Sequence, residues 1–147
     1  IRANRIKFAL EIVQEIREEV GDQFVIFYRI AADDNMENGI TIDDAKYLAV
    51  KLVEAGVDVL DVSQGLAGSR PVTNQQGFFV HLAEGIKSVV NIPVITTGGI
   101  TDAKFAYHVI KDGKADLVGI GRAILDNEDW VSEALQEFSN IDEAVKE

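Results

Sequence analysis

The sequence predicts an α/β fold in which an amino-terminal helix is followed by four strand–helix units with parallel strands. Three observations support this prediction. Short apolar runs alternate with segments whose apolar residues recur every three or four positions, as in buried strands and amphipathic helices. Gly residues stand where several of these segments end. The 147 residues, 47% hydrophobic and 27% charged, are enough for one domain with a sizeable core, so residues 1–147 form a single unit.

The first part of the chain contains one helix and one strand–helix unit. Residues 4–20 carry apolar residues at spacings of three and four, and Gly21 follows where a left-handed C-cap is wanted. The run FVIFYRI, residues 24–30, predicts a fully buried strand, because no polar residues alternate with the apolar ones. A polar loop leads to a second helix, for which Thr41 or Asp43 is the expected N-cap.

The rest of the chain repeats this strand–helix pattern. Thr101 or Asp102 is the expected N-cap of a helix over 103–111. The expected elements, in order, are a strand over 57–63, a helix of about a dozen residues after Gly77, a strand that opens at Pro93, a helix over 103–111, a strand over 115–121 and a helix from near Asp126 or Asn127.

Alternating strands and helices favour a parallel sheet covered by helices on both faces. Two architectures fit the pattern: a small open doubly wound sheet, and half of a (β/α)8 barrel of the TIM type. A complete barrel usually needs about 250 residues and at least about 200, so this chain cannot close one alone. In both architectures the functional site lies at the carboxyl ends of the strands.

The charge and composition exclude several classes of function. Fourteen Lys and Arg against 25 Asp and Glu give a net charge of −11, which repels nucleic acids and anionic membranes, so neither is an expected partner. The absence of Cys excludes disulfides and thiolate sites and is compatible with the reducing cytoplasm, the expected location. No apolar run approaches the roughly 18 residues of a membrane span. The chain begins at Ile1, which predicts a processed product or a fragment.

Two neighbouring strand ends carry the strongest functional signal. Gly98 and Gly99 end the strand PVITTG directly before a helix, and Gly121 and Arg122 end the next strand. Glycines at such positions let backbone N–H groups approach an anion, and a following helix N-terminus adds partial positive charge. Arg adds a fixed positive charge, and its guanidinium can donate two hydrogen bonds to the same anion. A phosphate site is therefore predicted here; the alternative is that the glycines only form turns.

Arg29 stands at the carboxyl end of the apolar run 24–30, where an unpaired buried cation would be unfavourable. One interpretation is a structural ion pair with Asp61 or Asp33. The other is a cation that faces a bound anion or an electron-rich cofactor.

No metal site and no hydrolase triad is expected. The acidic loop around residues 33–44 lacks the Gly position and the closing Glu of a calcium loop. His81 and His108 fall within expected helices at no metal-ligand spacing, so surface or core-edge positions are expected for both. Ser63 and Ser69 have no obvious base nearby.

Five segments in the same order carry a family resemblance. NRIKFALEIVQEIREEVG followed by FYRI, LVEAGVDVLDVSQG, IPVITTGGI and GKADLVGIGRAILDNEDWV are similar to the old yellow enzyme family of FMN-dependent NAD(P)H oxidoreductases. The likeness extends from about Asn4 to Trp130. It corresponds to the carboxyl-terminal half of that family's (β/α)8 barrel, from the helix before strand five to the helix after strand eight.

The resemblance implies FMN at the carboxyl end of the strands and NADH or NADPH as the reductant. It implies that Arg29 faces the pyrimidine edge of the flavin, that Gly98 and Gly99 donate backbone N–H groups to the FMN phosphate, and that Gly121 and Arg122 form a second phosphate contact. The family passes hydride from FMN to an activated alkene or similar small-molecule acceptor. Its substrate clamp and proton donor lie on earlier strands, so the resemblance assigns no catalytic residue to this sequence.

Half a barrel has two open strand edges, so we expect this chain to dimerise or to take up the missing amino-terminal half. Alone, the chain is expected to bind phosphate weakly and to be inactive. One alternative is a non-catalytic phosphate- or nucleotide-binding α/β module. Another is a phosphosugar isomerase or aldolase-type barrel, which would need a Lys or a carboxylate at a strand end, where only Asp61 is well placed.

Overall fold

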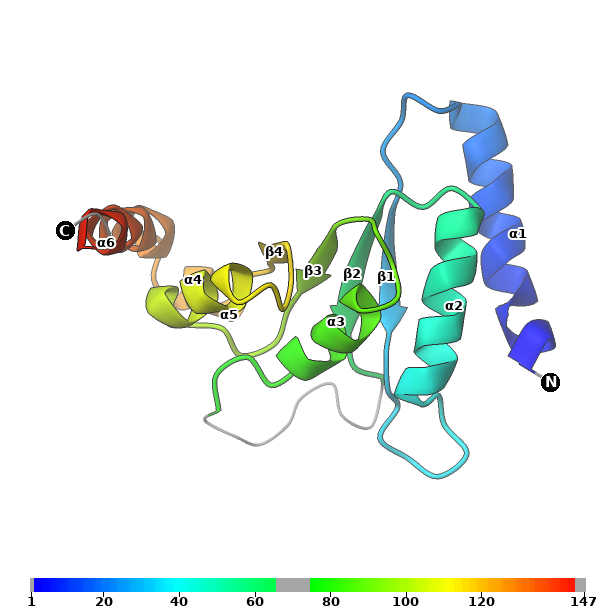
Figure 1. Cartoon of the computed structure of the whole chain (residues 1–147), viewed down its shortest axis with the longest axis horizontal. Coiled ribbons are helices and arrows are strands. Elements are labelled where there is room, and N and C mark those ends of the chain that lie inside the picture. The colour runs from blue at the N-terminus through cyan, green and yellow to red at the C-terminus, as the bar shows by residue number, and fades with distance from the viewer. Residues whose placement is uncertain (1, 66–74, 145–147) are drawn as a thin grey trace.

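Four short strands of the described residues pair in parallel, in the order β1-β2-β3-β4 (Figure 1). The structure is a computed structural model that describes residues 2–65 and 75–144. The strands are β1 (Phe27–Ala31), β2 (Val59–Ser63), β3 (Val94–Thr96) and β4 (Leu117–Val118). The helices are α1 (Arg2–Val20), α2 (Ile42–Glu54), α3 (Val80–Lys87), α4 (Ala103–Lys111), α5 (Arg122–Asp126) and α6 (Trp130–Ala144).

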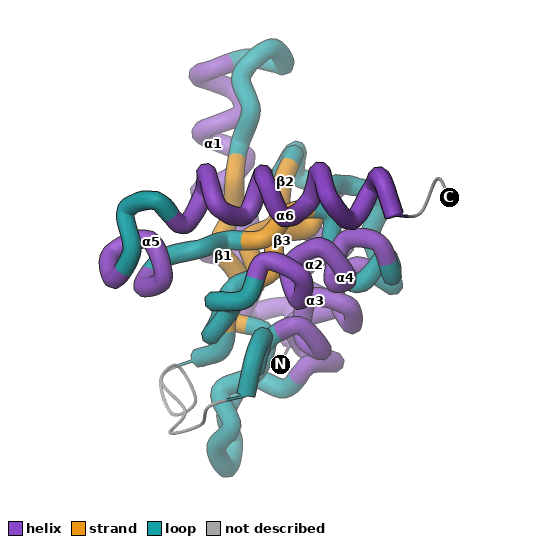
Figure 2. Tube along the Cα trace, turned by 90° about the vertical axis from the view of Figure 1, so that its left-hand side faces the viewer, coloured by secondary structure: helices purple, strands orange, loops and turns teal. Residues whose placement is uncertain are grey.

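The strand order decides between the two architectures. Strands that follow one another in chain order, joined by right-handed crossovers, place every connecting helix on the same face of the sheet. A doubly wound sheet reverses its order at a switch point, and this sheet has no reversal. The half-barrel prediction is therefore confirmed. The expectation of helices on both faces was wrong: α2, α3 and α4 pack on one face, and α1 packs outside α2 (Figures 1 and 2).

The two faces of the sheet differ in burial. Side chains that point toward the helices are fully buried, among them Ile30, Leu60 and Val94. On the opposite face Phe27 is 60% exposed, and Leu117 is 48% exposed. The prediction of a fully buried strand over 24–30 was therefore wrong, because β1 has one uncovered face and begins only at Phe27. An apolar run of this kind marks a strand but does not reveal how many layers cover it.

Most element boundaries agree with the sequence pattern. Helix α4 spans the predicted residues with Asp102 as its N-cap, Thr41 caps α2, and Gly21 adopts a φ of 70° after α1. Strand β4 is far shorter than the predicted 115–121, because it pairs with a single neighbour. The predicted last helix is α6, which begins at Trp130, a few residues later than expected, and the short helix α5 before it was not predicted. Among the described residues no helix is both long and apolar enough to cross a membrane.

Two aspartates fasten the amino ends of the strands in the same way. Asp58 precedes β2, and Asp116 precedes β4. Each accepts a backbone N–H from the beginning of the neighbouring strand, β1 or β3. Each also pairs with a cation in the last turn of the helix that leads into that neighbour, α1 or α3. The contacts are Ile26 N–Asp58 Oδ2 (2.8 Å) with Arg17 Nη2–Asp58 Oδ2 (2.5 Å), and Val94 N–Asp116 Oδ2 (2.9 Å) with Lys87 Nζ–Asp116 Oδ1 (2.5 Å). The elements from α1 to β4 thus form two α–β–α–β units, each closed by an aspartate with the same set of contacts.

These contacts favour the charged carboxylates. The Ile26 N–H, followed by Arg17, holds the pKa of Asp58 below its ordinary value against the opposing effect of desolvation. The Lys87 ammonium, followed by the Val94 N–H, does the same for the pKa of Asp116.

Candidate functional site

An open cavity of about 790 Å³ lies at the carboxyl ends of the strands, on the face that the helices do not cover. Its walls come from the uncovered side of β1, β2 and β3 and from the turns that follow β3 and β4. In a parallel sheet the carboxyl ends of all strands meet at one edge, so residues distant in sequence converge there. The cavity lining includes each of the residues that the sequence singled out: Arg29, Gly98, Gly99, Gly121 and Arg122.

The turn after β3 can only be made by glycine. Gly98 has a φ of +102° and Gly99 a φ of +66°, in the region that side chains other than glycine rarely adopt. A Cβ on either residue would collide with the ring of Phe78. Within the described chain, the N–H groups of both glycines donate to no protein acceptor. Turn geometry therefore explains these two glycines, and their N–H groups remain available at the cavity wall.

Gln76 binds the residues that follow the glycine turn. Its Oε1 accepts the N–H groups of Thr101 (2.9 Å) and Asp102 (3.3 Å), and its Nε2 donates to Thr101 Oγ1 (2.6 Å). The Asp102 side chain accepts the N–H of Phe105 (2.7 Å). The start of α4 is therefore already capped by a carboxylate and an amide. The expectation that this helix N-terminus adds partial positive charge for an anion stays a prediction, and the glycine turn before it offers N–H groups that no described residue accepts.

The turn after β4 is built differently. A Cβ on Gly121 would meet no atom within 4 Å, and its φ of −119° lies outside the left-handed region. Neither packing nor a positive φ demands glycine here, and the absent side chain leaves open space beside the cavity. Arg122 is exposed at the start of α5, and its side chain makes no hydrogen bond or ion pair with any described residue. It is thus a cation available to a ligand.

Arg29 lies beside Asp61 on the neighbouring strand, with 2.5 Å between Arg29 Nη1 and Asp61 Oδ2. The Arg29 side chain is 59% exposed, so the expectation that it is buried was wrong. The ion-pair interpretation is confirmed for Asp61. Asp33 instead accepts the N–H of Asn35 (2.6 Å). Arg29 also lines the cavity, so the ion pair and the cavity-facing cation are the same arrangement.

Sequence reasoning missed several residues of the cavity wall. Phe78 packs on the glycine turn, and Thr97 Oγ1 donates to the carbonyl of Val62 (3.1 Å), which joins β2 to the end of β3. Gln76 binds residues about 25 positions away in the sequence, and no local pattern predicts such a contact. Ser69 lies outside the described residues, as does the middle of the loop over 64–77.

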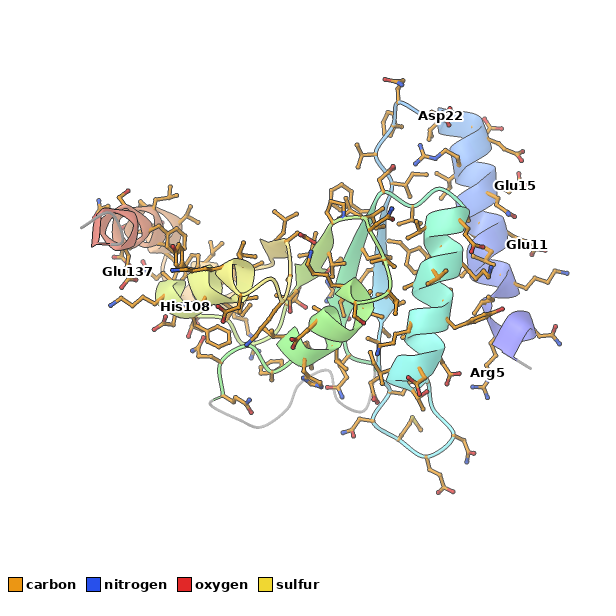
Figure 3. All side chains as sticks on the ribbon, viewed as in Figure 1. Arg5, Glu11, Glu15, Asp22, His108 and Glu137 are labelled. Carbon is orange, nitrogen blue, oxygen red and sulfur yellow. The ribbon has the colours of Figure 1, made fainter. Side chains whose placement is uncertain are left out.

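The remaining candidates lie away from the cavity. His81 and His108 are exposed, as expected from the sequence, and Figure 3 shows His108 on the outside of α4. No group of three or more metal-ligating side chains occurs within residues 2–65 and 75–144.

The cavity offers hydrogen-bond donors and cations that are suited to an anion. At one end of the cavity lie the backbone N–H groups of Gly98 and Gly99, the open space at Gly121 and Arg122, which pairs with no described residue; N–H groups and a guanidinium are donors that an anion accepts. Arg29 provides a second cation on the cavity floor. In a chain with a net charge of −11, these local cations are what makes an anion site possible.

Comparison with known proteins places the chain among flavin enzymes. Residues 2–140 match the model of the NADH:flavin oxidoreductase / NADH oxidase family. The chain is 43% identical over 141 residues to an NADH oxidase of Thermoanaerobacter brockii, covering 92% of this chain and 22% of that protein. It is 36% identical to an NADPH dehydrogenase of Geobacillus sp. (strain WCH70), covering 92% of this chain and 39% of that one. The chain therefore spans well under half the length of these relatives.

Solved structures support the fold. A 2-naphthoyl-CoA reductase in complex with 2-naphthoyl-CoA superposes with a TM-score of 0.80 at 23% identity, over 91% of this chain and 21% of that one. A histamine dehydrogenase from Rhizobium sp. 4-9 superposes with a TM-score of 0.75 at 24% identity, over 91% of this chain and 20% of that one.

Proposed function

Because the chain belongs to the NADH:flavin oxidoreductase / NADH oxidase family, we propose that it forms the FMN-binding part of an NAD(P)H-dependent oxidoreductase. One observation carries the proposal: the two glycine-bearing strand ends and Arg29 open onto a single cavity. The N–H groups of the glycine turn and the Arg122 guanidinium at one end of the cavity suit a phosphate. The second cation, Arg29, suits the flavin ring to which that phosphate is joined.

In this proposal the chain grips the phosphate from two sides. The N–H groups of Gly98 and Gly99 point donors at the anion from one turn, and the Arg122 guanidinium holds it from the other. The space that Gly121 leaves open lets the backbone approach the phosphate closely. Among the described residues Arg122 has no ion-pair partner, which supports this role, since no carboxylate of that part of the chain has to be displaced.

At the ring end, Arg29 faces the pyrimidine edge of the flavin and stabilises negative charge there. Bound FMN would supply hydride transfer between NADH or NADPH and a small-molecule acceptor such as an activated alkene. The chain's own part is to hold the cofactor and set the charge at its pyrimidine edge. We assign no proton donor to the described residues.

We also propose that the uncovered face of the sheet is completed by the remainder of a barrel. Strands β1 and β4 each have one unpaired edge, and the apolar side chains of Phe27 and Leu117 are exposed on the open face. This chain covers 22% and 39% of two of its relatives, so these proteins are long enough to contain such a segment. Association of two copies is the alternative way to cover the same face.

Titration of the chain with FMN and with riboflavin, followed by flavin fluorescence, tests the proposal. We expect FMN to bind more tightly than riboflavin, and Arg122→Ala to weaken FMN binding about tenfold without changing riboflavin binding. The matched control is Arg5→Ala, an exposed arginine on α1 far from the cavity (Figure 3).

Equal binding of FMN and riboflavin, or an unaltered FMN affinity in Arg122→Ala, would contradict the phosphate grip. Binding of inorganic phosphate or ADP with no preference for flavin would favour the non-catalytic module instead.

A further inference from the structure

The Arg29–Asp61 pair stands apart from the other ion pairs of the sheet. Arg29 and Asp61 are register partners on β1 and β2, on the face that lines the cavity, and 2.5 Å separates Nη1 from Oδ2. Both side chains belong to the cavity wall. The pair therefore lies at the candidate site and not at the amino ends of the strands, where Asp58 and Asp116 bind.

Asp61 does not fasten the strands as those two aspartates do. Asp58 and Asp116 each accept a backbone N–H from a neighbouring strand as well as a cation. Among the described residues, Asp61 accepts a hydrogen bond from Arg29 alone. Its other oxygen, Oδ1, is buried and meets no donor from residues 2–65 and 75–144. A buried acceptor left unpaired destabilises the fold, so the contribution of Asp61 to folding does not explain its presence here.

Arg29, in contrast, gains from its partner. Its side chain is long and 59% exposed, and within the described chain its guanidinium donates only to Asp61. Such a side chain loses considerable rotamer freedom when a ligand fixes it. The Asp61 carboxylate already binds one nitrogen of the Arg29 guanidinium, so it restricts the rotamers of Arg29 before a ligand binds. The remaining N–H groups of the guanidinium stay available to the cavity.

We propose that Asp61 is a positioning residue that holds the Arg29 guanidinium toward the pyrimidine edge of the flavin. The inference rests on the proposed function, since it requires a flavin at that end of the cavity. It predicts that Asp61 affects binding through Arg29 and through the ring, with no effect specific to the phosphate.

A double-mutant cycle in the same flavin titration tests this. We expect Asp61→Ala to weaken FMN and riboflavin binding alike, about tenfold, when Arg29 is present. In the Arg29→Ala background we expect Asp61→Ala to change either affinity less than twofold, because its partner is absent. Asp61→Asn, which keeps the shape and loses the charge, should give an intermediate weakening.

Thermal unfolding of the ligand-free chain separates positioning from folding. Asp61→Ala should unfold at or above the temperature of the unmodified chain, since it removes the unpaired acceptor. The control Asp58→Ala, which loses the bonds from Arg17 and from the Ile26 N–H at the amino end of β2, should unfold at a lower temperature and, where folded, bind FMN normally.

Equal loss of affinity from Asp61→Ala in both backgrounds, or a loss that accompanies a lower unfolding temperature, would overturn this inference and leave the proposed function standing. Failure of the unmodified chain to bind FMN, or to distinguish it from riboflavin, would instead overturn the proposed function and this inference with it.

Discussion

The glycines at the cavity have two different physical explanations. Gly98 and Gly99 are required by left-handed backbone and by the packing of Phe78, whatever the ligand. Gly121 is required by neither, because a Cβ there would stand in open space. A glycine that the protein's own packing does not need is more informative about a ligand than one that a turn needs.

Alanine substitutions separate these two kinds of glycine. We expect Gly99→Ala to lower the free energy of unfolding by about 1–2 kcal/mol, since it forces a side chain into left-handed backbone against a ring. Gly121→Ala should leave that free energy within about 0.5 kcal/mol while it weakens FMN binding, because the methyl group enters the cavity. Urea unfolding and flavin titration measure the two effects. A large loss of stability in Gly121→Ala would refute the open-space interpretation.

At the scale of elements, the contacts of Asp58 and Asp116, here called the carboxylate clasps, join each pair of strands to a helix. Asp58 links α1, β1 and β2, and Asp116 links α3, β3 and β4. Each clasp lies at the amino ends of the strands, opposite the cavity. In (β/α)8 barrels the amino ends of the strands contribute to stability, and active sites lie at the carboxyl ends.

The clasps predict a dependence of stability on pH. Both carboxyl groups have folded pKa values below the ordinary 3.8, so their stabilisation is fully present above 3.8 and disappears as the pH falls through the folded values. Asp58→Asn and Asp116→Asn should each lose about 1 kcal/mol at pH 7, a modest value because both side chains are more than a third exposed.

Urea unfolding at several pH values measures this. The difference between each variant and the unmodified chain should shrink as the pH falls below 3.8, when the carboxylates of the unmodified chain become protonated. Asp22→Asn, at an exposed loop carboxylate (Figure 3), is the matched control and should show no difference at any pH. A difference that persists undiminished in strong acid would argue against the clasps.

At the scale of the molecule, the sheet is covered on one side only. The helices bury Ile30, Leu60 and Val94, while Phe27 and Leu117 remain exposed on the other face. Exposed apolar side chains on a face bounded by two unpaired strand edges are a template for association.

We therefore expect the isolated chain to associate at micromolar concentrations. Sedimentation velocity should detect species heavier than the 16.1 kDa monomer, and the double substitution Phe27→Lys with Leu117→Lys should shift the population to monomer. Leu125→Lys, at an 85% exposed site outside the cavity lining, is the control and should leave association unchanged. A chain that stays monomeric at all concentrations would contradict the expectation.

The sequence alone was enough to predict the elements and to single out the candidate residues. Run length and periodicity predicted α4 to its terminal residues, because a helix depends on contacts within a few positions. Gly98, Gly99, Gly121 and Arg122 follow apolar runs directly, so their place at strand ends could be predicted from local pattern. Their convergence followed from one general property, that parallel strands end at a common edge.

Tertiary structure alone decided what depends on contacts between distant segments. The covered face, the exposure of Phe27 and the partner of Arg29 all depend on strand order, which periodicity does not encode. The contacts of Gln76 with Thr101 and Asp102 join residues some 25 positions apart. Local sequence determines where the backbone bends and which side chains it offers, but only packing determines which of those side chains meet.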